Sequence, residues 1–523
     1  MAKSTKSLIG GMTVLGLTGI ICKLVGVLFS IPLTWIIGAD GLGIFQSVFP
    51  TYNLLLTVSS AGLPVAVSRM VSHCLAKDDP RNAKRVFRTA LWLLAALGLI
   101  CTILMLVCNP LLVARVKEPE SSMGFYVIAP CVAIVCVLAA FRGFMQGQQN
   151  MVPTATSQLI EQVGKVFISL PLAYLGSRHS LAAGAAGALL GITIVEALAL
   201  LYMILLYFRR RASFDTIPQL SDEPPIATRT LSERLLRISV PITISSCIVP
   251  LAQFVDSAMM VDRMIASGLT QAQARPLYGL FSGLVIRLIN IPTGLALAVA
   301  MSLVPAISAA KAVNDSKAIA QQANFGLRFA FLIGMPCSVG MSLLARPIMA
   351  FFYESTLSAE HLRIASELLS MSSLTVVLFT VVQATSSILQ GLHRQRLPMY
   401  TLVAGVACKI LLNYILIGTP GINIYGGPIA SIVCYTVSMV PNLYFVCKHG
   451  QLRFNWMGWV VRPGLATAAM GAAVWLARTL LPTGRFWTLA EVALGVAVFI
   501  AAALFFKAMT PDDFRAFRRT RKA

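Results

Sequence analysis

The sequence has 523 residues, of which 57% are hydrophobic and only 12% are Asp, Glu, Lys or Arg. An average soluble domain carries about twice that charged fraction, so the composition excludes an ordinary water-soluble globule. The formal net charge of +22 would also suit a nucleic-acid-binding protein. However, the basic residues form short clusters between apolar segments, and this placement favours an integral membrane protein with no nucleic-acid partner.

Long apolar segments recur along the chain. A spanning helix needs about 20 mostly apolar residues to cross a hydrocarbon core of about 30 Å. The first such segment continues too far to be a cleaved secretory signal, so we interpret it as a retained helix. The sequence therefore predicts an all-α polytopic membrane protein with about fourteen transmembrane helices. They are expected near 8–37, 44–70, 89–113, 124–145, 154–175, 183–208, 236–261, 277–308, 325–352, 364–390, 397–418, 425–447, 459–481 and 487–508.

The distribution of Lys and Arg predicts the orientation of these helices. With the N-terminus in the cytoplasm, roughly three times as many basic residues fall on the cytoplasmic side as on the opposite side, as the positive-inside rule requires. We therefore expect both termini and the long polar connection after the sixth helix to be cytoplasmic.

Short sequence similarities between the two halves suggest an internal repeat. Met-Gln-Gly at 145–147 recurs as Leu-Gln-Gly at 389–391, and Lys165 and Lys409 keep the same spacing. An even number of helices per half predicts two parallel six-helix lobes followed by two extra helices. Chance similarity of Ala-, Gly- and Leu-rich helices is the alternative. The expected segments are an N-terminal lobe at 1–208, a cytoplasmic linker at 209–235, a C-terminal lobe at 236–447, and the extra helices with a basic tail at 448–523.

Ionisable residues inside apolar spans are candidates for function, because each costs about 2.5–3.5 kcal/mol to insert. Lys23 lies halfway along the first helix, and Arg287, followed by Asn290, lies within the eighth. The repeat makes the first helix equivalent to the seventh and the second equivalent to the eighth. We therefore expect the cations of the first and eighth helices to line the gap between the lobes and to bind a phosphate or diphosphate. Together with Lys409, these are the candidate substrate-binding residues. Structural pairing with an intramembrane carboxylate is the competing interpretation.

Other charged residues suggest different roles. Glu161 precedes Lys165 by four residues, a spacing that favours a structural ion pair on one helix face. Asp256, near Gln253 in the seventh helix, is the candidate for coupling to Na⁺ or H⁺. Neither the Cys nor the His residues show metal-ligand spacing, and no nucleotide-binding or nucleophile motif is found. We therefore expect a transporter, with no metal site, catalytic residue or cofactor.

Two segments carry a family resemblance: Phe-Arg-Gly-Phe-Met-Gln-Gly-Gln-Gln-Asn-Met-Val-Pro-Thr at 141–154, continuing through 158–162, and Ser-Leu-Val-Pro-Ala-Ile-Ser at 302–308. They resemble the multidrug/oligosaccharidyl-lipid/polysaccharide exporter superfamily, in particular the polysaccharide-transporter branch that contains stage V sporulation protein B and the lipid II flippases. The resemblance implies a V-shaped pair of lobes in a bacterial plasma membrane, with alternating access for a polyprenyl-diphosphate-linked glycan or peptidoglycan precursor. Cell-wall synthesis enzymes are the implied protein partners.

The resemblance also implies roles for residues. Cavity arginines engage the diphosphate in lipid II flippases, and Lys23 and Arg287 occupy matching places. Where those flippases carry further basic residues, this chain has Phe29 and Leu-Thr at 56–57, which leaves open lipid II, a related polyprenyl-linked glycan or a sporulation-specific role. Two alternatives remain: a cation-coupled antiporter of drugs or small molecules from the same superfamily, and a non-transporting membrane scaffold.

Overall fold

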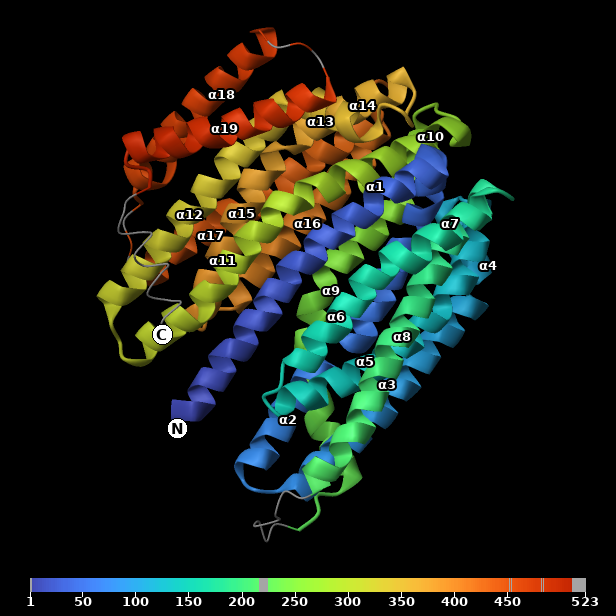
Figure 1. Ribbon diagram of the computed structural model, residues 1–523, viewed down its shortest axis with the longest axis vertical. Coiled ribbons are helices and arrows are strands. Elements are labelled where there is room, and N and C mark those ends of the chain that lie inside the picture. Colours follow the sequence, from blue (N-terminus) through green and yellow to red (C-terminus); the bar gives the residue numbers. More distant parts are fainter. Residues whose placement is uncertain are drawn as a thin grey trace. The chain divides into compact units, whose positions relative to one another are not determined.

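The computed structural model describes residues 2–215, 224–450, 452, 454–480, 482 and 484–509. Within these ranges the chain forms helices joined by short connections, and no strand is present. Contacts group the helices into two compact units, Met1–Gly279 and Leu280–Ala523, and each is described by itself (Figure 1). The lobe and linker boundaries expected from the sequence remain a prediction.

Unit 1 contains the first ten α-helices and two short helical segments. The segments are η1 (Pro119–Ser121), a 3₁₀ turn, and η2 (Lys165–Ser169), a π-helix. The α-helices are α1 (Ala2–Ser60), α2 (Leu63–Ala76), α3 (Pro80–Val107), α4 (Asn109–Val116), α5 (Ser122–Gly147), α6 (Val152–Gly164), α7 (Leu170–Ser177), α8 (Leu181–Asp215), α9 (Thr228–Ala266) and α10 (Gln271–Tyr278).

A π-helix, η3 (Gly279–Val285), connects α10 to the helices of unit 2. Those helices are α11 (Ile286–Ala312), α12 (Ser316–Leu343), α13 (Ala345–Tyr353), α14 (Ala359–Ser372), α15 (Leu374–Gly391), α16 (Arg396–Ile417), η4 (Asn423–Tyr425), α17 (Gly426–Gly450), η5 (Met457–Val461), α18 (Arg462–Leu480) and α19 (Arg485–Phe505).

The count of spans is close to the predicted fourteen. Twelve helices of the described chain are long and apolar enough to cross a membrane, or thirteen if the bent pair Thr228–Ile244 and Ser246–Ala266 is one span. The predicted third to sixth and eighth to fourteenth helices each correspond to one of them. The all-helical, multi-pass membrane fold is therefore confirmed, whereas the number fourteen is not.

Besides the bent pair in α9, the difference lies at the N-terminal end, where α1 runs through the predicted boundary between the first two helices. It bends at Gly38, whose φ of +67° and ψ of −172° suit only glycine. The predicted second span, 44–70, is instead interrupted before α2, which has Pro64 in its first turn. A side chain in place of Gly62 at this break would collide with the backbone of Ser239 in α9.

The N-termini of α3 and α12 have matching caps. The Asp79 carboxylate accepts a hydrogen bond of 2.9 Å from the backbone N–H of Asn82 at the start of α3. Asp315 caps α12 in the same way, at 3.0 Å from the backbone N–H of Ala318. Such caps satisfy a backbone donor that the first helical turn leaves open.

The C-termini of α5 and α15 also match. Each helix ends at the glycine of the repeated tripeptide, Gly147 or Gly391, and two residues later Gln149 and His393 both have a φ of +60°. Equivalent left-handed turns after equivalent helices support the internal repeat predicted from the sequence.

The outer faces of several helices carry large apolar side chains. Trp92 of α3 is 78% exposed, Phe167 of η2 is 73% exposed, and Phe505 of α19 is 81% exposed. Exposed apolar surface on this scale is unfavourable in water and suits contact with lipid chains.

Unit 1 includes the C-terminal end of the connection predicted as a linker. The side chain of Asn82 accepts a hydrogen bond of 3.0 Å from the backbone N–H of Ile226 and donates one of 3.4 Å to the carbonyl oxygen of Pro224. These bonds attach the chain just before α9 to the start of α3.

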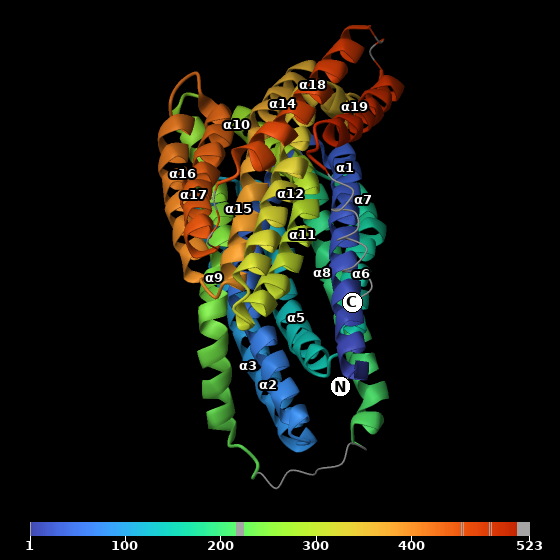
Figure 2. The same cartoon turned by 90° about the vertical axis from the view of Figure 1, so that its left-hand side faces the viewer.

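The last two helices, α18 and α19, pack against each other in unit 2 (Figure 2). Arg328 of α12 donates two hydrogen bonds to the carbonyl oxygen of Ala508, just after α19, at 2.8 Å from Nε and 2.6 Å from Nη2. Buried Leu332, Ala466 and Ala503 pack beside this contact.

Candidate functional site

A buried ion pair joins α5 to α6 within unit 1. Arg142 of α5 donates a hydrogen bond of 2.9 Å from Nε to Ser157 Oγ, and its Nη2 forms an ion pair with Glu161 Oε1. Ser157 and Glu161 are four residues apart, so they share one face of α6. The side chains of the pair are only 15% and 10% exposed, so the protein encloses the pair.

A second carboxyl group, Glu196, meets this pair from α8. Glu196 is 5% exposed and lies near the middle of the span Leu181–Arg210. Its carboxyl group interacts electrostatically with Glu161, Lys165 and Arg142. The predicted pairing of Glu161 with Lys165 is therefore replaced by a pairing with Arg142.

The π-helix η2 packs closely against α8 beside these carboxyl groups. A side chain in place of Gly191 on α8 would collide with Ser169, and one in place of Gly164 would lie 2.6 Å from Val195. The hydroxyl oxygen of Ser169 is buried and makes no hydrogen bond. Single π-helical turns are rare and occur frequently at functional sites.

Tyr52 of α1 and Cys131 of α5 are two further polar residues near Glu196. The Tyr52 hydroxyl lies 3.3 Å from the Cys131 sulfur, and both residues are buried. Each also interacts electrostatically with Glu196. Polar groups from α1, α5, α6 and α8 therefore lie close to one another in unit 1. We call four of these residues, Arg142 of α5, Ser157 and Glu161 of α6 and Glu196 of α8, the carboxyl-pair site.

Asp256, the predicted ion-coupling residue, lies elsewhere in unit 1. It is half-buried on α9, three residues after Gln253. The Gln253 side chain accepts a hydrogen bond of 3.1 Å from Asn53 of α1. Asp256 is thus one helical turn from a polar contact between two spans.

Arg287, the predicted anion-binding residue, lies in unit 2 at the start of α11. Its Nη1 atom is shielded from solvent, and Tyr353, at the end of α13, interacts with it electrostatically. Burial raises the pKa of the Tyr353 hydroxyl well above its ordinary value, an effect that Arg287 opposes. Arg287 is therefore half-buried, with one end of its guanidinium shielded from solvent.

The structure places two of the other predicted substrate-binding residues. Asn290, one turn further along α11, is exposed, and Lys409 is half-buried on α16. The side chain of Lys23 lies outside the part of the chain that the structure describes. Their convergence on one anion site remains a prediction.

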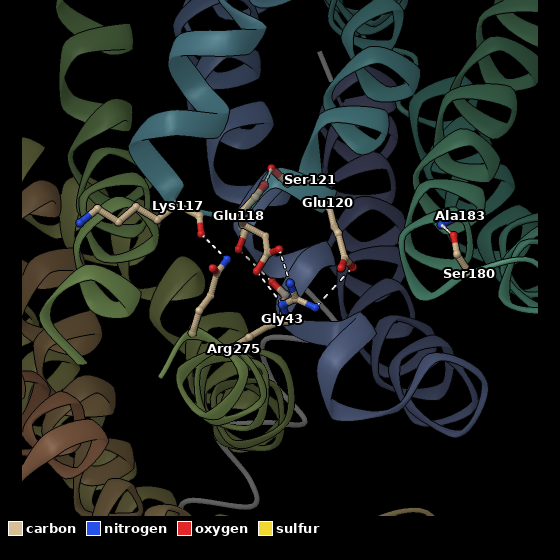
Figure 3. Close-up of polar contacts among 10 residues, drawn as sticks. Gly43, Lys117, Glu118, Glu120, Ser121, Ser180, Ala183 and Arg275 are labelled. Carbon is tan, nitrogen blue, oxygen red and sulfur yellow. Dashed lines mark hydrogen bonds and ion pairs between the residues drawn. The ribbon is translucent and has the colours of Figure 1, made fainter. Parts of the chain in front are cut away.

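A further ion-pair cluster, which the sequence did not indicate, fastens α10 to the turn between α4 and η1 (Figure 3). Arg275 forms two hydrogen bonds of 2.7 Å with Glu118, from Nε to Oε2 and from Nη2 to Oε1. Its Nη1 lies 3.3 Å from Glu120 Oε2. Nearby, the Gln271 side chain donates a hydrogen bond of 2.7 Å to the carbonyl oxygen of Lys117.

Backbone geometry fixes this contact, which we call the α10 latch and define as Glu118, Glu120 and Arg275. The Ser121 hydroxyl donates a hydrogen bond of 2.6 Å to the Glu118 carbonyl oxygen. A Cβ atom at Gly43 of α1 would lie 2.5 Å from the Arg275 carbonyl oxygen, so glycine permits the approach. Burial raises the pKa of the Glu118 carboxyl, an effect that Arg275 opposes.

Apolar spans that enclose paired charged groups are typical of membrane transporters, and the comparisons with known proteins assign the family. Residues 8–311 match the family model described as "Polysaccharide biosynthesis protein", and residues 241–415 match the MatE model. Because the first match covers more than half of the sequence, the chain belongs to the polysaccharide biosynthesis protein family. The predicted membership of the multidrug/oligosaccharidyl-lipid/polysaccharide exporter superfamily is confirmed.

Relatives match over nearly the whole chain. Lipid II flippase MurJ of Bacillus subtilis (strain 168) is 25% identical over 516 residues, 96% of this chain and 94% of that protein. Stage V sporulation protein B of the same organism is 23% identical over 525 residues, 98% of each chain. The protein is accordingly a flippase or transporter of this superfamily, and the relatives are not enzymes.

Solved structures show the same fold. Lipid II flippase MurJ in an inward closed conformation has a TM-score of 0.72 at 15% identity, covering 94% of this chain and 98% of that one. An inward-facing multidrug resistance MATE family transporter has a TM-score of 0.68 at 16% identity, covering 83% of this chain and 96% of that one.

Proposed function

We propose that this protein moves a polyprenyl diphosphate bearing a glycan or peptidoglycan precursor across the bacterial plasma membrane by alternating access. The relatives that match along nearly the full chain include proteins named for lipid II flipping and for sporulation. In this proposal the enzymes that build the lipid-linked precursor and those that consume it are the functional partners.

The observation that carries the proposal is the half-buried Arg287 in an apolar span, whose Nη1 atom is shielded from solvent. A diphosphate that leaves water for a partly dehydrated site loses hydrogen bonds, and charge-assisted bonds to a cation replace them. Arginine suits this role because its fixed fork of donors matches phosphate oxygens. Asn290, Lys409 and Lys23 are the further proposed contacts.

Replacement of Arg287 tests the proposal. Arg287→Ala should reduce substrate movement by about tenfold or more, since a hydrogen bond to a charged group contributes about 1.5–3 kcal/mol. Arg287→Lys should retain part of the activity because it keeps the charge without the fork. The measurement is movement of a fluorescent polyprenyl-diphosphate disaccharide in proteoliposomes that hold the full chain, normalised to correctly inserted protein.

Arg229→Ala is the matched control, because Arg229 has a 92% exposed side chain paired only with Glu233 at the surface. A near-normal specific activity of Arg287→Ala would refute the anion-site role. If Arg287 only supports Tyr353, then Arg287→Ala and Tyr353→Phe should both lower the amount of folded protein and leave specific activity unchanged.

A cation-coupled antiporter of small molecules is the second candidate, favoured by the MatE match over 241–415 and by the buried carboxyl groups of unit 1. Binding of the purified full chain to polyprenyl-diphosphate lipid and to a cationic drug separates the two functions. For a flippase, we expect the lipid to bind and a cationic drug not to displace it. Binding of the drug without binding of the lipid would favour the antiporter.

A further inference from the structure

Two amide side chains meet inside the apolar spans of unit 1. Asn53 of α1 donates a hydrogen bond of 3.1 Å from Nδ2 to Oε1 of Gln253 on α9. Asn53 is half-buried and Gln253 is exposed. A primary amide has two N–H donors and a carbonyl oxygen with two lone pairs, so one bond uses only part of what each side chain offers. We call Asn53 and Gln253 the amide pair.

The depth of the amide pair indicates that it faces polar surroundings. Gln253 lies about 10 Å from the start and about 20 Å from the end of Ser246–Ala266, at 1.5 Å per residue. Hydrocarbon chains form no hydrogen bonds, so contact between them and an exposed amide costs free energy. Polar side chains at such depth face the interior of a helix bundle or a water-filled space. We therefore expect water or a polar ligand beside Gln253.

The amide pair joins helices that the sequence assigns to different lobes. The repeat places Asn53 in the predicted N-terminal lobe, 1–208, and Gln253 in the predicted C-terminal lobe, 236–447. Transporters built from repeats bind their substrates near the middle of the membrane, where the repeats meet. A ligand of the amide pair would contact both predicted lobes at once.

We propose that Asn53 and Gln253 bind the glycan of the lipid-linked substrate through its uncharged hydroxyl and amide groups. This inference rests on the function proposed above and names the part of the substrate that the amide pair recognises. A diphosphate is an anionic acceptor that suits a cation, and a polyprenyl chain has no hydrogen-bonding group. A sugar hydroxyl both donates and accepts. It can therefore accept from Asn53 Nδ2 and donate to Gln253 Oε1 in place of their direct bond.

The competing account is a hydrogen bond that only holds α1 against α9, as polar side chains often do between membrane helices. The two accounts differ in the effect of the sugar. If the amide pair binds the glycan, its loss weakens binding of a glycosylated lipid and leaves binding of the bare lipid diphosphate unchanged. If the pair is only structural, its loss affects both lipids equally.

The test measures two dissociation constants for each variant of the purified full chain. The probes are a short-chain polyprenyl diphosphate that carries an N-acetylated disaccharide, and the same lipid without the sugar. Asn53→Leu and Gln253→Leu remove the hydrogen-bonding groups with little change in size. Each should weaken binding of the glycosylated lipid by about threefold to tenfold, with no change for the bare lipid. The ratio of the two constants does not depend on how much of the protein is folded.

Two reference variants complete the comparison. Gln395→Leu alters an exposed amide just before α16 and should leave both constants unchanged. Arg287→Ala should weaken binding of both lipids alike and so preserve their ratio. An unchanged ratio in Asn53→Leu and Gln253→Leu would overturn the inference and leave the proposed function intact. If the unchanged protein binds neither lipid, the proposed function itself fails.

Discussion

The carboxyl group of Asp256 is half-buried in an apolar helix, and it lies one turn from the Asn53–Gln253 hydrogen bond. If a cation binds there, Asp256→Asn should weaken the dependence of transport on that ion while protein abundance and lipid binding stay nearly normal. The measurement is transport rate against Na⁺ concentration and against pH. Asp262→Asn is the control on the same helix, because Asp262 pairs with Lys117 near the helix end. An unchanged ion dependence in Asp256→Asn would remove this residue from the mechanism.

At the scale of residues, the sequence showed which charged residues lie within apolar spans, but it did not show which residues form ion pairs with them. Spacing along one helix suggested that Glu161 pairs with Lys165, but Arg142 reaches Glu161 from α5, across a connection. Glu196, also noticeable as a charge within an apolar span, meets Glu161 only through the packing of α8. Such contacts depend on how helices rotate and pack, which periodicity does not specify.

The α10 latch gives a stability prediction for a single element. Glu118→Ala removes two hydrogen bonds of the mostly buried Arg275 and leaves the exposed Glu120 as its ion-pair partner, with Asp40 acting on it electrostatically. Removing one partner of a buried ion pair costs about 3–5 kcal/mol, and we expect about 3 kcal/mol here because Glu120 remains. Thermal unfolding of the detergent-solubilised chain measures this. Glu120→Ala, at an exposed pair, should cost about 1 kcal/mol or less, and equal losses in the two variants would contradict the account.

The same carboxyl group predicts a dependence on pH. Burial raises the pKa of Glu118 in the folded protein, so the native state binds this proton more tightly than the unfolded chain does. The stability that Glu118 contributes is therefore fully present below its ordinary pKa and decreases as pH rises through the raised value. As pH rises through this window, the unfolding temperature of the unchanged protein should fall relative to that of Glu118→Gln. Parallel curves for the two proteins would rule out this linkage.

At the scale of elements, apolar length predicted most spans, since a hydrocarbon core sets the minimum length of a helix that crosses it. Local breaks were harder to predict. The bend at Gly38 and the interruption before α2 arise from a positive φ and from close contact with α9, and neither feature changes the apolar character of the segment.

At the scale of the whole molecule, the orientation in the membrane is a testable prediction. The excess of Lys and Arg on one side predicts that both termini and the connection at 209–235 are cytoplasmic. In a variant without native cysteines, Ser221→Cys should resist an impermeant thiol reagent in intact cells and react after the membrane is opened. Reaction in intact cells would reverse the orientation. A cysteine at Glu120, expected on the opposite side, serves as the positive control.

The repeat was predicted from a few residues and gains support from the backbone. The tripeptides at 145–147 and 389–391 end equivalent helices, and Gln149 and His393 adopt the same left-handed turn. The sequence could indicate this symmetry because turns require particular residues. It could not indicate the α10 latch, because Glu118 and Arg275 have no spacing that marks them as partners.

The contact between Arg328 and Ala508 can form only late in the synthesis of the chain. Arg328 leaves the ribosome 180 residues before the carbonyl oxygen that accepts its two hydrogen bonds. A nascent chain that has inserted α12 therefore completes this contact only when translation is almost finished. A chain terminated before Ala508 would lack that acceptor, and a chain terminated before α18 would also expose the face of α12 that packs on it, a defect that membrane quality control can recognise.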